Sequence, residues 1–459
     1  MGELREEGDA VLAARLLIYY VTGHGLGHLT RSLAVAGEFL RHNWRVTFCT
    51  AVEEPVIQRL LRDGWAAATG TDADSIVDRL AVRTVQLDVG CVQRDAVHVC
   101  PADTLRAYAQ LDAQREERIA QESQYLSNQQ PDWILSDAVP LSAPAAERAG
   151  LRHRFSFITN FFFSTIYDEY LYLDAVVSEK TQQLVQRMTA DECTATHVFH
   201  LSPGRAPLPR GYAGAVTPVP LVARPAYRSR ESVRAALHIP PDAAVALVMF
   251  GGASGSRTMR PTRSLWDVQA VDADAHWRLL VCENVPRTVT DGDEDDDGDH
   301  LPAAYVRVPP ARQYLPDLLQ AADVVVGKLG YGTCSECLAY RRPLVFVRRA
   351  HFAEEPYLLA DMQQQRLAVE MPLDDLRAGR WSGYLQQALA LRSEAASATY
   401  DNGSVTHGTA TVFAHVSRQL HLTSIAPADA ADAPQCPAAA DRSCCCADPP
   451  RPRTPPATP

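Results

Sequence analysis

Short apolar runs that alternate with segments of helical periodicity restrict the fold of this chain more than any other feature. Runs that are apolar at nearly every position are typical of strands covered on both faces, as in a parallel sheet. Between the first two runs, the stretch 29–42 has helical spacing. Strand and helix alternate, so the sequence predicts the α/β class. The runs of the first half cover 16–21, 45–50, 82–90, 132–137, 154–159 and 197–202.

A Pro-rich stretch separates this series from a second one. Its prolines are too dense for a helix or a central strand and predict a linker over 203–241. We therefore expect two doubly wound, Rossmann-like domains that face each other across a cleft, with ligands at the carboxyl ends of the strands. The second series covers 245–252, 278–283, 305–309, 324–330, 343–349 and 368–372.

The chain ends are poor in apolar residues. The last segment is rich in Ala, Pro and Asp and cannot bury enough apolar surface to fold, so we expect a disordered tail. The acidic stretch 291–299 is expected to be a solvated loop. The predicted organisation is an N-terminal extension (1–14), a first domain (15–202), the linker (203–241), a second domain with closing helices (242–423) and the tail (424–459).

Composition excludes several classes of protein. The 459 residues carry a net charge of -11, which argues against nucleic acid or anionic lipid as a partner. No apolar run approaches the roughly 18 residues of a membrane span. The N-terminus lacks the pattern of a signal peptide, so we expect a cytoplasmic protein without disulfides. Cys334 and Cys337 have no second cysteine pair at zinc spacing, and we expect no metal site.

The motif GHGLGH (23–28) follows an apolar strand and opens a helix. Backbone amides and the helix dipole can face a ligand at such a position, and Gly25 and Gly27 would let the ligand approach closely. The motif is not the dinucleotide fingerprint, which would need glycine at His28, nor a Walker A loop. It does place an imidazole, the side chain best suited to proton abstraction near neutral pH, at the edge of the sheet.

Asp137 ends another apolar strand and should lie at the same edge as His28. A carboxylate there would fix the tautomer of the imidazole and stabilise its protonated form. Two other interpretations remain open at this point: His28 caps its own helix, or Asp137 begins the helix that follows it. Their occurrence at the ends of two strands of one sheet favours a functional pair.

The second half contains a comparable motif, in which a strand leads to Gly330, Gly332 and Thr333 and then to a helix with Glu336. Glycines let backbone amides approach a diphosphate at the positive end of the helix, and Glu336 could accept hydrogen bonds from a ribose. The alternative is a capping box formed by Thr333 and Glu336, which would leave the paired glycines unexplained.

Two further strand ends carry candidate ligand groups. Glu354 and Glu355 follow the strand at 343–349 and could hold sugar hydroxyls, although a solvated acidic pair is equally consistent with that stretch. Gly251 and Gly252, in MFGGASGS, could accommodate a phosphate or simply turn the chain.

The order of GHGLGH, SDAVP, the Pro-rich linker, FGG, GYGTCSECLAYRRPLVF and EEP resembles the glycosyltransferases of the GT-B fold, especially family 28. The blocks YYVTGHGLGH, LDVGCVQRDA, SDAVP, TNFFFSTIYDEY and LGYGTCSECLAY are similar to the N-terminal region of plant-type L-arabinokinases. The likeness covers roughly residues 15–420, and several of these blocks are specific.

This resemblance implies an inverting transfer in which a nucleotide-diphosphate sugar, with UDP as the expected nucleotide, binds the second domain and an unknown acceptor binds the first. His28 would be the general base and Asp137 its partner. Gly332 and Thr333 would face the diphosphate, Glu336 the ribose, and Glu354 with Glu355 the donor sugar. Such enzymes use no metal or other cofactor, because helix dipole and amides stabilise the leaving diphosphate.

The sequence departs from both families. L-arabinokinases continue into a kinase domain with its own ATP loop, which we do not find here, so we expect no sugar kinase activity in this chain but keep a separate sugar kinase as a candidate partner. His24 stands where the transferase motif has glycine, and it is a second candidate for the base. Two alternatives stay open: a non-catalytic module that binds a sugar or nucleotide sugar, and an epimerase or hydrolase of nucleotide sugars.

Overall fold

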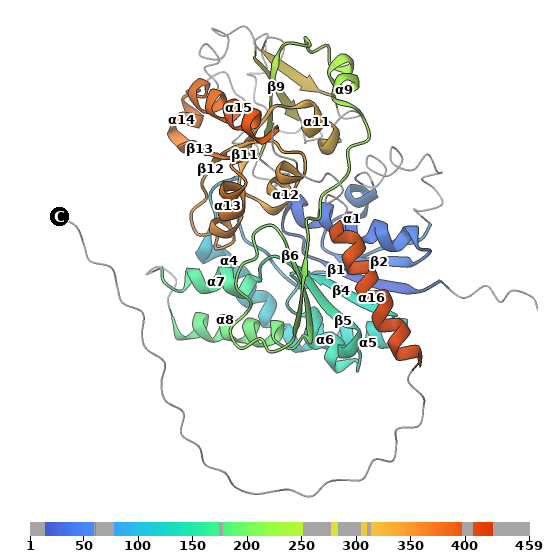
Figure 1. Cartoon of the computed structure of the whole chain (residues 1–459). Helices are drawn as coiled ribbons and strands as arrows, with labels where there is room; N and C mark the ends of the chain where they lie inside the picture. Colours follow the sequence, from blue (N-terminus) through green and yellow to red (C-terminus); the bar gives the residue numbers. More distant parts are fainter. Residues whose placement is uncertain are drawn as a thin grey trace, which may run out of the picture. The chain divides into compact units, whose positions relative to one another are not determined.

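The computed structural model describes residues 14–58, 60, 78–173, 178–250, 277–282, 304–309, 314–396 and 407–425. The chain up to Ser417 clusters into one unit that contains two parallel sheets, each with helices packed on its faces (Figure 1). In the remaining unit, the described residues are the C-terminal part of the last helix, α16 (His407–Ile425).

The first sheet has the strand order β3-β2-β1-β4-β5-β6-β7, and every described pair in it is parallel. Its central strands are completely buried, as expected for apolar runs covered on both faces. The strands are β1 (Leu16–Val21), β2 (Arg45–Thr50), β3 (Leu80–Thr84), β4 (Trp133–Asp137), β5 (Phe155–Thr159), β6 (His197–Leu201) and β7 (Ala215–Val219).

The second sheet has the order β10-β9-β8-β11-β12-β13 and is also parallel throughout its described pairs. The α/β class and the two doubly wound sheets predicted from the apolar runs are thereby confirmed. The strands are β8 (Ala244–Met249), β9 (Trp277–Cys282), β10 (Tyr305–Val308), β11 (Val324–Lys328), β12 (Leu344–Val347) and β13 (Ala368–Glu370).

Each sheet reverses its strand order at one point, and ligands of open α/β sheets bind at such points. In the first sheet the reversal lies between β1 and β4, whose last residues, Val21 and Asp137, are in register. In the second sheet it lies between β8 and β11, which ends at Lys328. The glycine-rich motifs of both halves therefore follow the strands that flank these two points.

Helices connect the strands and start where the local sequence favours it. In α1 the backbone of Gly25 has φ +72°, which favours glycine, and in α8 the side chains of Ser178 and Thr181 form a reciprocal capping box. The other described helices are α4 (Pro101–Asp112), α5 (Arg115–Gln129), α6 (Ser142–Arg148), α7 (Phe163–Tyr170), α9 (Arg230–Ala236), α11 (Leu315–Ala321), α12 (Tyr331–Ala339), α13 (Glu355–Gln364), α14 (Leu373–Arg377) and α15 (Ser382–Ala396), with α1 spanning Gly25–Arg41 and α8 Glu179–Glu192.

The stretch 203–241 differs from the linker that the prolines predict. It contributes β7 to the first sheet and also contains α9. β7 tolerates Pro218 because it lies at the edge of the sheet, where a missing backbone N–H leaves no central ladder incomplete. Proline density therefore excluded a central strand here but not an edge strand.

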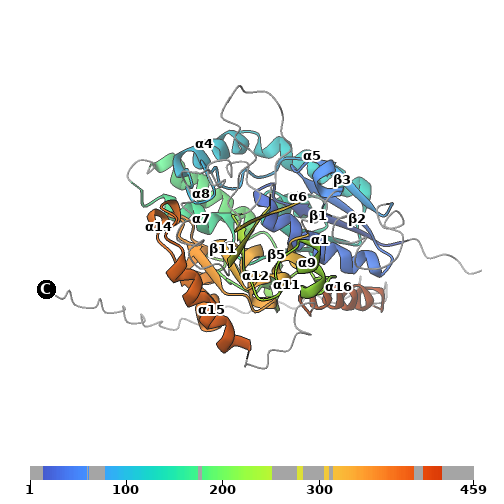
Figure 2. The ribbon, with the colours of Figure 1, turned by 90° about the horizontal axis from the view of Figure 1, so that it is seen from above.

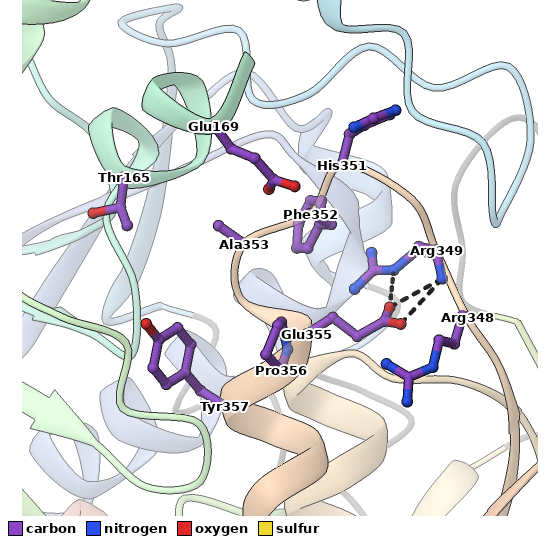
Figure 3. Close-up of a pocket in the computed structure, with 10 residues that line it drawn as sticks. All are labelled: Thr165, Glu169, Arg348, Arg349, His351, Phe352, Ala353, Glu355, Pro356 and Tyr357. Atoms are coloured by element: carbon purple, nitrogen blue, oxygen red, sulfur yellow. Dashed lines mark hydrogen bonds and ion pairs between the residues drawn. The ribbon is translucent and has the colours of Figure 1, made fainter. Parts of the chain in front are cut away.

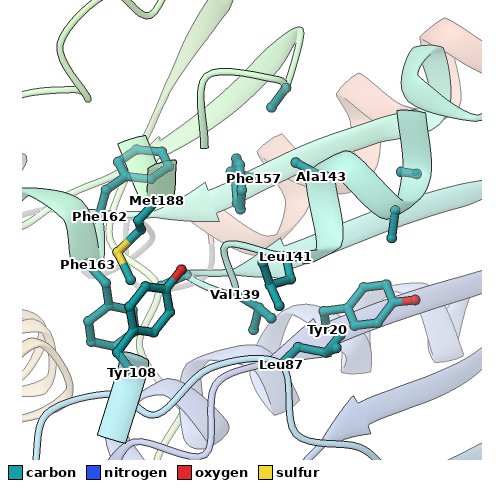
Figure 4. Packing of buried hydrophobic residues seen from close by; sticks show 14 of the residues in the cluster. Tyr20, Leu87, Tyr108, Val139, Leu141, Ala143, Phe157, Phe162, Phe163 and Met188 are labelled. Atoms are coloured by element: carbon teal, nitrogen blue, oxygen red, sulfur yellow. The ribbon is translucent and has the colours of Figure 1, made fainter. Parts of the chain in front are cut away.

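The core of the first sheet is rich in aromatic residues. Figure 4 shows part of this buried cluster, in which Tyr20 of β1 and Phe157 of β5 occur together with Met188 of α8. Burial of such side chains stabilises the sheet that positions the candidate site. None of the described helices is both long enough and apolar enough to cross a membrane.

Candidate active site

The loop between β1 and α1 places His28 beside Asp137 at the carboxyl edge of the first sheet. His28 lies one turn into α1, and its Nδ1 is 2.8 Å from Oδ1 of Asp137. Nδ1 also lies 3.0 Å from Nη2 of Arg31, but the carboxylate can only accept, so we assign the ring hydrogen to Nδ1 and the lone pair to Nε2. No described residue forms a hydrogen bond with Nε2, so the ring has the geometry of a general base.

This placement removes the two other interpretations of the pair. The side chain of His28 does not cap α1, whose N-cap is His24 without a side-chain hydrogen bond. Asp137 does not begin a helix, because α6 starts at Ser142. Ala138, directly after Asp137, has φ +55°, an uncommon backbone conformation for a residue with a side chain.

Arg31 is a member of the site that the sequence reasoning missed. Its Nε lies 2.7 Å from Oδ2 of Asp137 and its Nη2 2.5 Å from Oδ1, so the guanidinium binds the carboxylate through both oxygens. Ser32 donates a further hydrogen bond to Asp137, at 3.0 Å, so that with His28 the side chain of Asp137 accepts four. Burial would raise the pKa of Asp137, but the charges of Arg31 and His28 and their hydrogen bonds hold it below its usual range. Asp137 is therefore ionised at neutral pH.

Helical spacing was the available signal for these residues. Positions 28, 31 and 32 lie on one face of a helix, and in α1 all three side chains are buried. A buried polar face directed at a strand end that carries an aspartate indicates a polar cluster rather than a solvated surface.

His24, the second candidate for the base, has a different environment. The backbone N–H of Cys91 donates to its Nδ1 at 3.0 Å, so the remaining ring hydrogen lies on Nε2. Burial and the charges of His28, Lys328 and Arg349 lower the pKa of His24 to about 3. The lone pair of Nδ1 in His24 already accepts a hydrogen bond, so the neutral ring can only donate, through Nε2. A base needs a free lone pair, and this favours His28 over His24 as the base.

Asp88, which follows β3, is a second residue that the sequence reasoning missed. Its Oδ1 accepts a hydrogen bond from Oγ1 of Thr22, 2.7 Å away, in the loop that leads to the histidines. Burial raises its pKa to about 6, against the hydrogen bonds from Thr22 and the amide of Gly90. In the sequence it is the acidic residue within the run at 82–90.

A hydrogen-bond chain leads from Asp137 to the second sheet. Nη1 of Arg31 donates to Oδ1 of Asn160 at 2.6 Å, and Nδ2 of Asn160 donates to Oε1 of Glu354 at 2.8 Å. Asn160 follows β5, whereas Glu354 is the N-cap residue of α13. All four side chains are buried, so the two halves of the chain share one polar network.

Glu354 and Glu355 are not a solvated pair. Both are buried, and Glu355 accepts hydrogen bonds from the backbone N–H of Arg349 at 3.1 Å and from its Nε at 3.2 Å. The guanidinium of Arg349 also lies 3.8 Å from Glu354. Burial raises the pKa of Glu355 although Arg349 opposes this. A donor sugar held by these carboxylates would have to share them with internal partners.

The glycine motif of the second half differs from the predicted capping box. Helix α12 begins at Tyr331 rather than at Thr333, its N-cap is Gly330, and it has no side-chain cap. Glu336 then lies in the second turn, too far along the helix to reach the N-cap amide. The first backbone amides of α12 thus have no side-chain cap and remain suited to an anion.

Helices α1 and α12 are in contact and lie side by side in Figures 1 and 2. A Cβ atom built on Gly332 would lie 3.5 Å from Cα of Gly27, so the two motifs touch through glycines. Two helix N-termini with positive partial charge that approach each other favour a negative ligand between them.

Lys328, at the end of β11, adds a cation to this place and was not predicted. A Cβ on Gly330 would lie 3.4 Å from its Nζ, which therefore sits beside the N-cap of α12. Burial, with the charge of Arg349, lowers the pKa of Lys328 to about 7. Within the described part of the chain, Nζ has no hydrogen bond or ion pair. In the sequence, the lysine that directly follows the apolar run VVVG indicates a cation at the end of this strand.

Glu336, expected to bind ribose, is buried against Arg224 instead. Both Nε and Nη2 of Arg224 lie 2.7 Å from its Oε1. Burial raises the pKa of Glu336, and the charge of Arg224 opposes this. Gly251 and Gly252 lie outside the described residues.

No metal site occurs in the described ranges, where no three His, Cys, Asp or Glu side chains gather suitably. Cys334 and Cys337 are buried free thiols in α12. A buried free thiol of this kind packs as a small hydrophobic side chain.

Comparison with known proteins supplies one relative by sequence. No protein-family model matches the chain. Over 391 residues, 84% of this chain, it is 31% identical to L-arabinokinase of Arabidopsis thaliana. The matched region is 34% of that protein, so the chain spans about a third of the length of the relative.

Solved structures with the same fold are glycosyltransferases. The calicheamicin glycosyltransferase CalG4 has a TM-score of 0.55 at 17% identity, over 91% of this chain and 100% of its own. The glycosyltransferase VinC in complex with dTDP has a TM-score of 0.53 at 16% identity, and TcCGT1 in complex with UDP has a TM-score of 0.56 at 12% identity. Each match covers 89% of this chain and 100% of the other chain. The chain therefore has the GT-B fold.

Proposed function

We propose that this protein is a glycosyltransferase that moves a sugar from a nucleotide-diphosphate sugar, UDP-sugar in the simplest case, to an acceptor hydroxyl. The observation that carries the proposal is the His28–Asp137 pair, joined at 2.8 Å, at the start of α1, where Gly27 touches the uncapped N-terminus of α12. The GT-B fold and the UDP and dTDP complexes among the similar structures support it.

In the proposed reaction Nε2 of His28 removes the proton of the acceptor hydroxyl. The acceptor oxygen forms a bond to the anomeric carbon while the bond to the diphosphate oxygen breaks on the opposite side, which inverts the configuration. The bonding electron pair leaves with the diphosphate. Asp137 stabilises the imidazolium that forms, and Arg31 keeps Asp137 ionised and oriented.

The leaving diphosphate is proposed to bind the first amides of α12, at Gly332 and Thr333, beside Lys328. Amides and a helix dipole aimed at the developing charge stabilise it without reorganisation. With a pKa of about 7, Lys328 is roughly half protonated near neutral pH and can take up a proton as the anion binds. These groups supply the stabilisation that a metal ion would give in other enzymes.

A thermal-shift screen tests the proposal. A ligand that binds the folded state raises its stability by about 2.7 kcal/mol at a hundred times its dissociation constant. We expect a UDP-sugar or dTDP-sugar to raise the midpoint, and mass spectrometry to show the sugar on an added acceptor. A midpoint that responds only to ATP or to free L-arabinose would exclude the transferase.

A second candidate function is a nucleotide-sugar-binding module without turnover. The internal partners of Glu354 and Glu355 favour it, because carboxylates that are already engaged are not free to orient a donor sugar for transfer, whereas a module needs only to hold its ligand. Binding of a nucleotide sugar without release of nucleotide, in the presence of a broad set of acceptors, would distinguish this module from the enzyme.

A further inference from the structure

A cavity of about 330 Å³ lies between α7 and the segment that joins β12 to α13. Its volume is within the range of small-molecule sites. Figure 3 shows Glu169 reaching from α7 toward the loop that carries Phe352 and Ala353. The lining also includes Thr165, Arg349, His351 and Tyr357.

Glu169 has a carboxylate oxygen that lacks a partner. Its Oε2 is buried, and no described residue donates a hydrogen bond to it. An ionised carboxylate only accepts, and Glu169 lines the cavity, so a donor that enters the cavity can bond to Oε1, the other oxygen of this carboxylate. Burial raises the pKa of Glu169, and the charge of His351 opposes this shift. Oε2 is closed off from solvent and its missing partner costs stability, whereas Oε1 is the oxygen available to a ligand hydroxyl.

The charges of the cavity favour a neutral ligand. Arg348 is paired with Glu370 at 2.7 Å, and Arg349 is paired with Glu355. Both cations thus have carboxylate partners, and the group left over is the carboxylate of Glu169. The carboxylate of Glu169 would repel a phosphate, whereas it offers an acceptor to a hydroxyl group.

One aromatic ring separates the cavity from the histidines. Phe352 lines the cavity, and its ring is stacked on that of His24 with 6.3 Å between the centroids. The guanidinium of Arg349 lies 3.9 Å from the centre of the same ring. Pro356 and the ring of Tyr357 offer apolar surface to the C–H groups of a sugar, while Glu169 and the hydroxyl group of Tyr357 offer polar atoms to its hydroxyls.

His351 adds an independent sign of a binding loop. Its backbone has φ +58°, which a residue with a side chain seldom adopts. Such conformations persist where the surroundings enforce them and are concentrated at ligand sites.

We propose that this cavity binds a neutral monosaccharide unit, with Glu169 accepting a hydrogen bond from one of its hydroxyl groups. The sugar is either a free acceptor or the sugar moiety of the donor. The role of this sugar in a transfer reaction rests on the proposed function, whereas its binding depends only on the cavity.

The test compares Glu169→Gln with Asp168→Asn. Gln keeps the size of the side chain and replaces an acceptor oxygen by a donor, whereas Asp168 is an exposed carboxylate one residue away. Calorimetry measures the binding of free pentoses and hexoses, of UDP, and of UDP-sugars to the three proteins. We expect Glu169→Gln to weaken the binding of a sugar about tenfold or more, and Asp168→Asn to leave it unchanged.

The measurements with free sugars and with UDP-sugars show whether the cavity holds an acceptor or the sugar of the donor. If the cavity holds an acceptor, Glu169→Gln lowers the affinity for a free sugar and leaves the affinity for UDP-sugar unchanged. If it holds the donor sugar, Glu169→Gln lowers the affinity for UDP-sugar toward that for UDP. An unchanged affinity for every sugar ligand in Glu169→Gln, or no sugar binding by the wild type, overturns the proposal. Binding of UDP tests the transferase proposal alone. A protein that binds a free sugar but not UDP would therefore contradict the proposed function without contradicting the sugar cavity.

Discussion

Asn160 connects the two halves of the site, because its Nδ2 donates a hydrogen bond to Oε1 of Glu354 at 2.8 Å while its Oδ1 accepts one from Arg31 at 2.6 Å. The amide is completely buried. An amide is suited to this position because it offers a donor to the carboxylate and an acceptor to the guanidinium. The orientation of Arg31 against Asp137 is thereby linked to the loop that precedes α13.

Replacing Asn160 by Ala should destabilise the protein by about 2 kcal/mol or more, since it leaves a buried guanidinium N–H and a carboxylate oxygen without their partner. Chemical unfolding at neutral pH measures the effect. Asn128→Ala, at an exposed position of α5, is the control and should change the unfolding free energy by less than about 0.5 kcal/mol. Equal stability of the two variants would show that Arg31 and Glu354 find other partners.

Replacing His28 by Ala should lower kcat of transfer by roughly 10²- to 10⁴-fold, because the acceptor proton loses its base. The affinity for UDP should not change, since the diphosphate is proposed to bind at α12. Turnover and UDP binding are both measured, with His153→Ala, an exposed histidine, as the control. Full turnover in His28→Ala would exclude the mechanism.

The sheets were predictable because their strands are buried on both faces and therefore read as continuous apolar runs. β1 and β2 occupy the residues that the sequence indicates. β7 was missed, because an edge strand that contains Pro218 lacks that signature. The strand-end rule also located His28 and Asp137, since it depends on topology alone.

The partners of the site residues were less accessible to sequence reasoning. Arg224 and Asn160 are far in sequence from Glu336 and Glu354, and nothing local indicates that they pair. The start of α12 was misplaced by two residues because Thr333 and Glu336 fit a capping box, a pattern that many helix starts share. Buried pairings of this kind depend on the packing of the whole chain.

Asp137→Asn should lower the free energy of unfolding at pH 7 by about 3 to 5 kcal/mol, because it leaves the charge of Arg31 buried without its anion. The folded-state pKa of Asp137 is lowered, so its contribution is present above the unfolded pKa of about 3.9 and is lost as the pH falls toward the folded value. The difference between wild type and variant should therefore shrink below about pH 4.

Urea unfolding between pH 3 and pH 8 measures this dependence. Asp103→Asn, which alters an exposed ion pair with Arg106, should follow the wild-type profile. A constant difference between Asp137→Asn and wild type over the whole range would mean that the carboxylate is not ionised in the folded protein.

Lys328 should take up a proton when UDP binds at pH 8. Its pKa in the free protein is lowered to about 7, so the amine is mostly neutral at pH 8, and a diphosphate beside it favours the charged form. Titration calorimetry in buffers with different ionisation enthalpies measures the number of protons bound. We expect uptake of a large part of one proton in the wild type and in Lys180→Met, an exposed lysine of α8, but not in Lys328→Met.

The affinity of the wild type for UDP should fall as the pH rises above 7, because charging the amine then costs more free energy. UDP binding without proton uptake, and with equal affinity in Lys328→Met, would place the diphosphate away from α12.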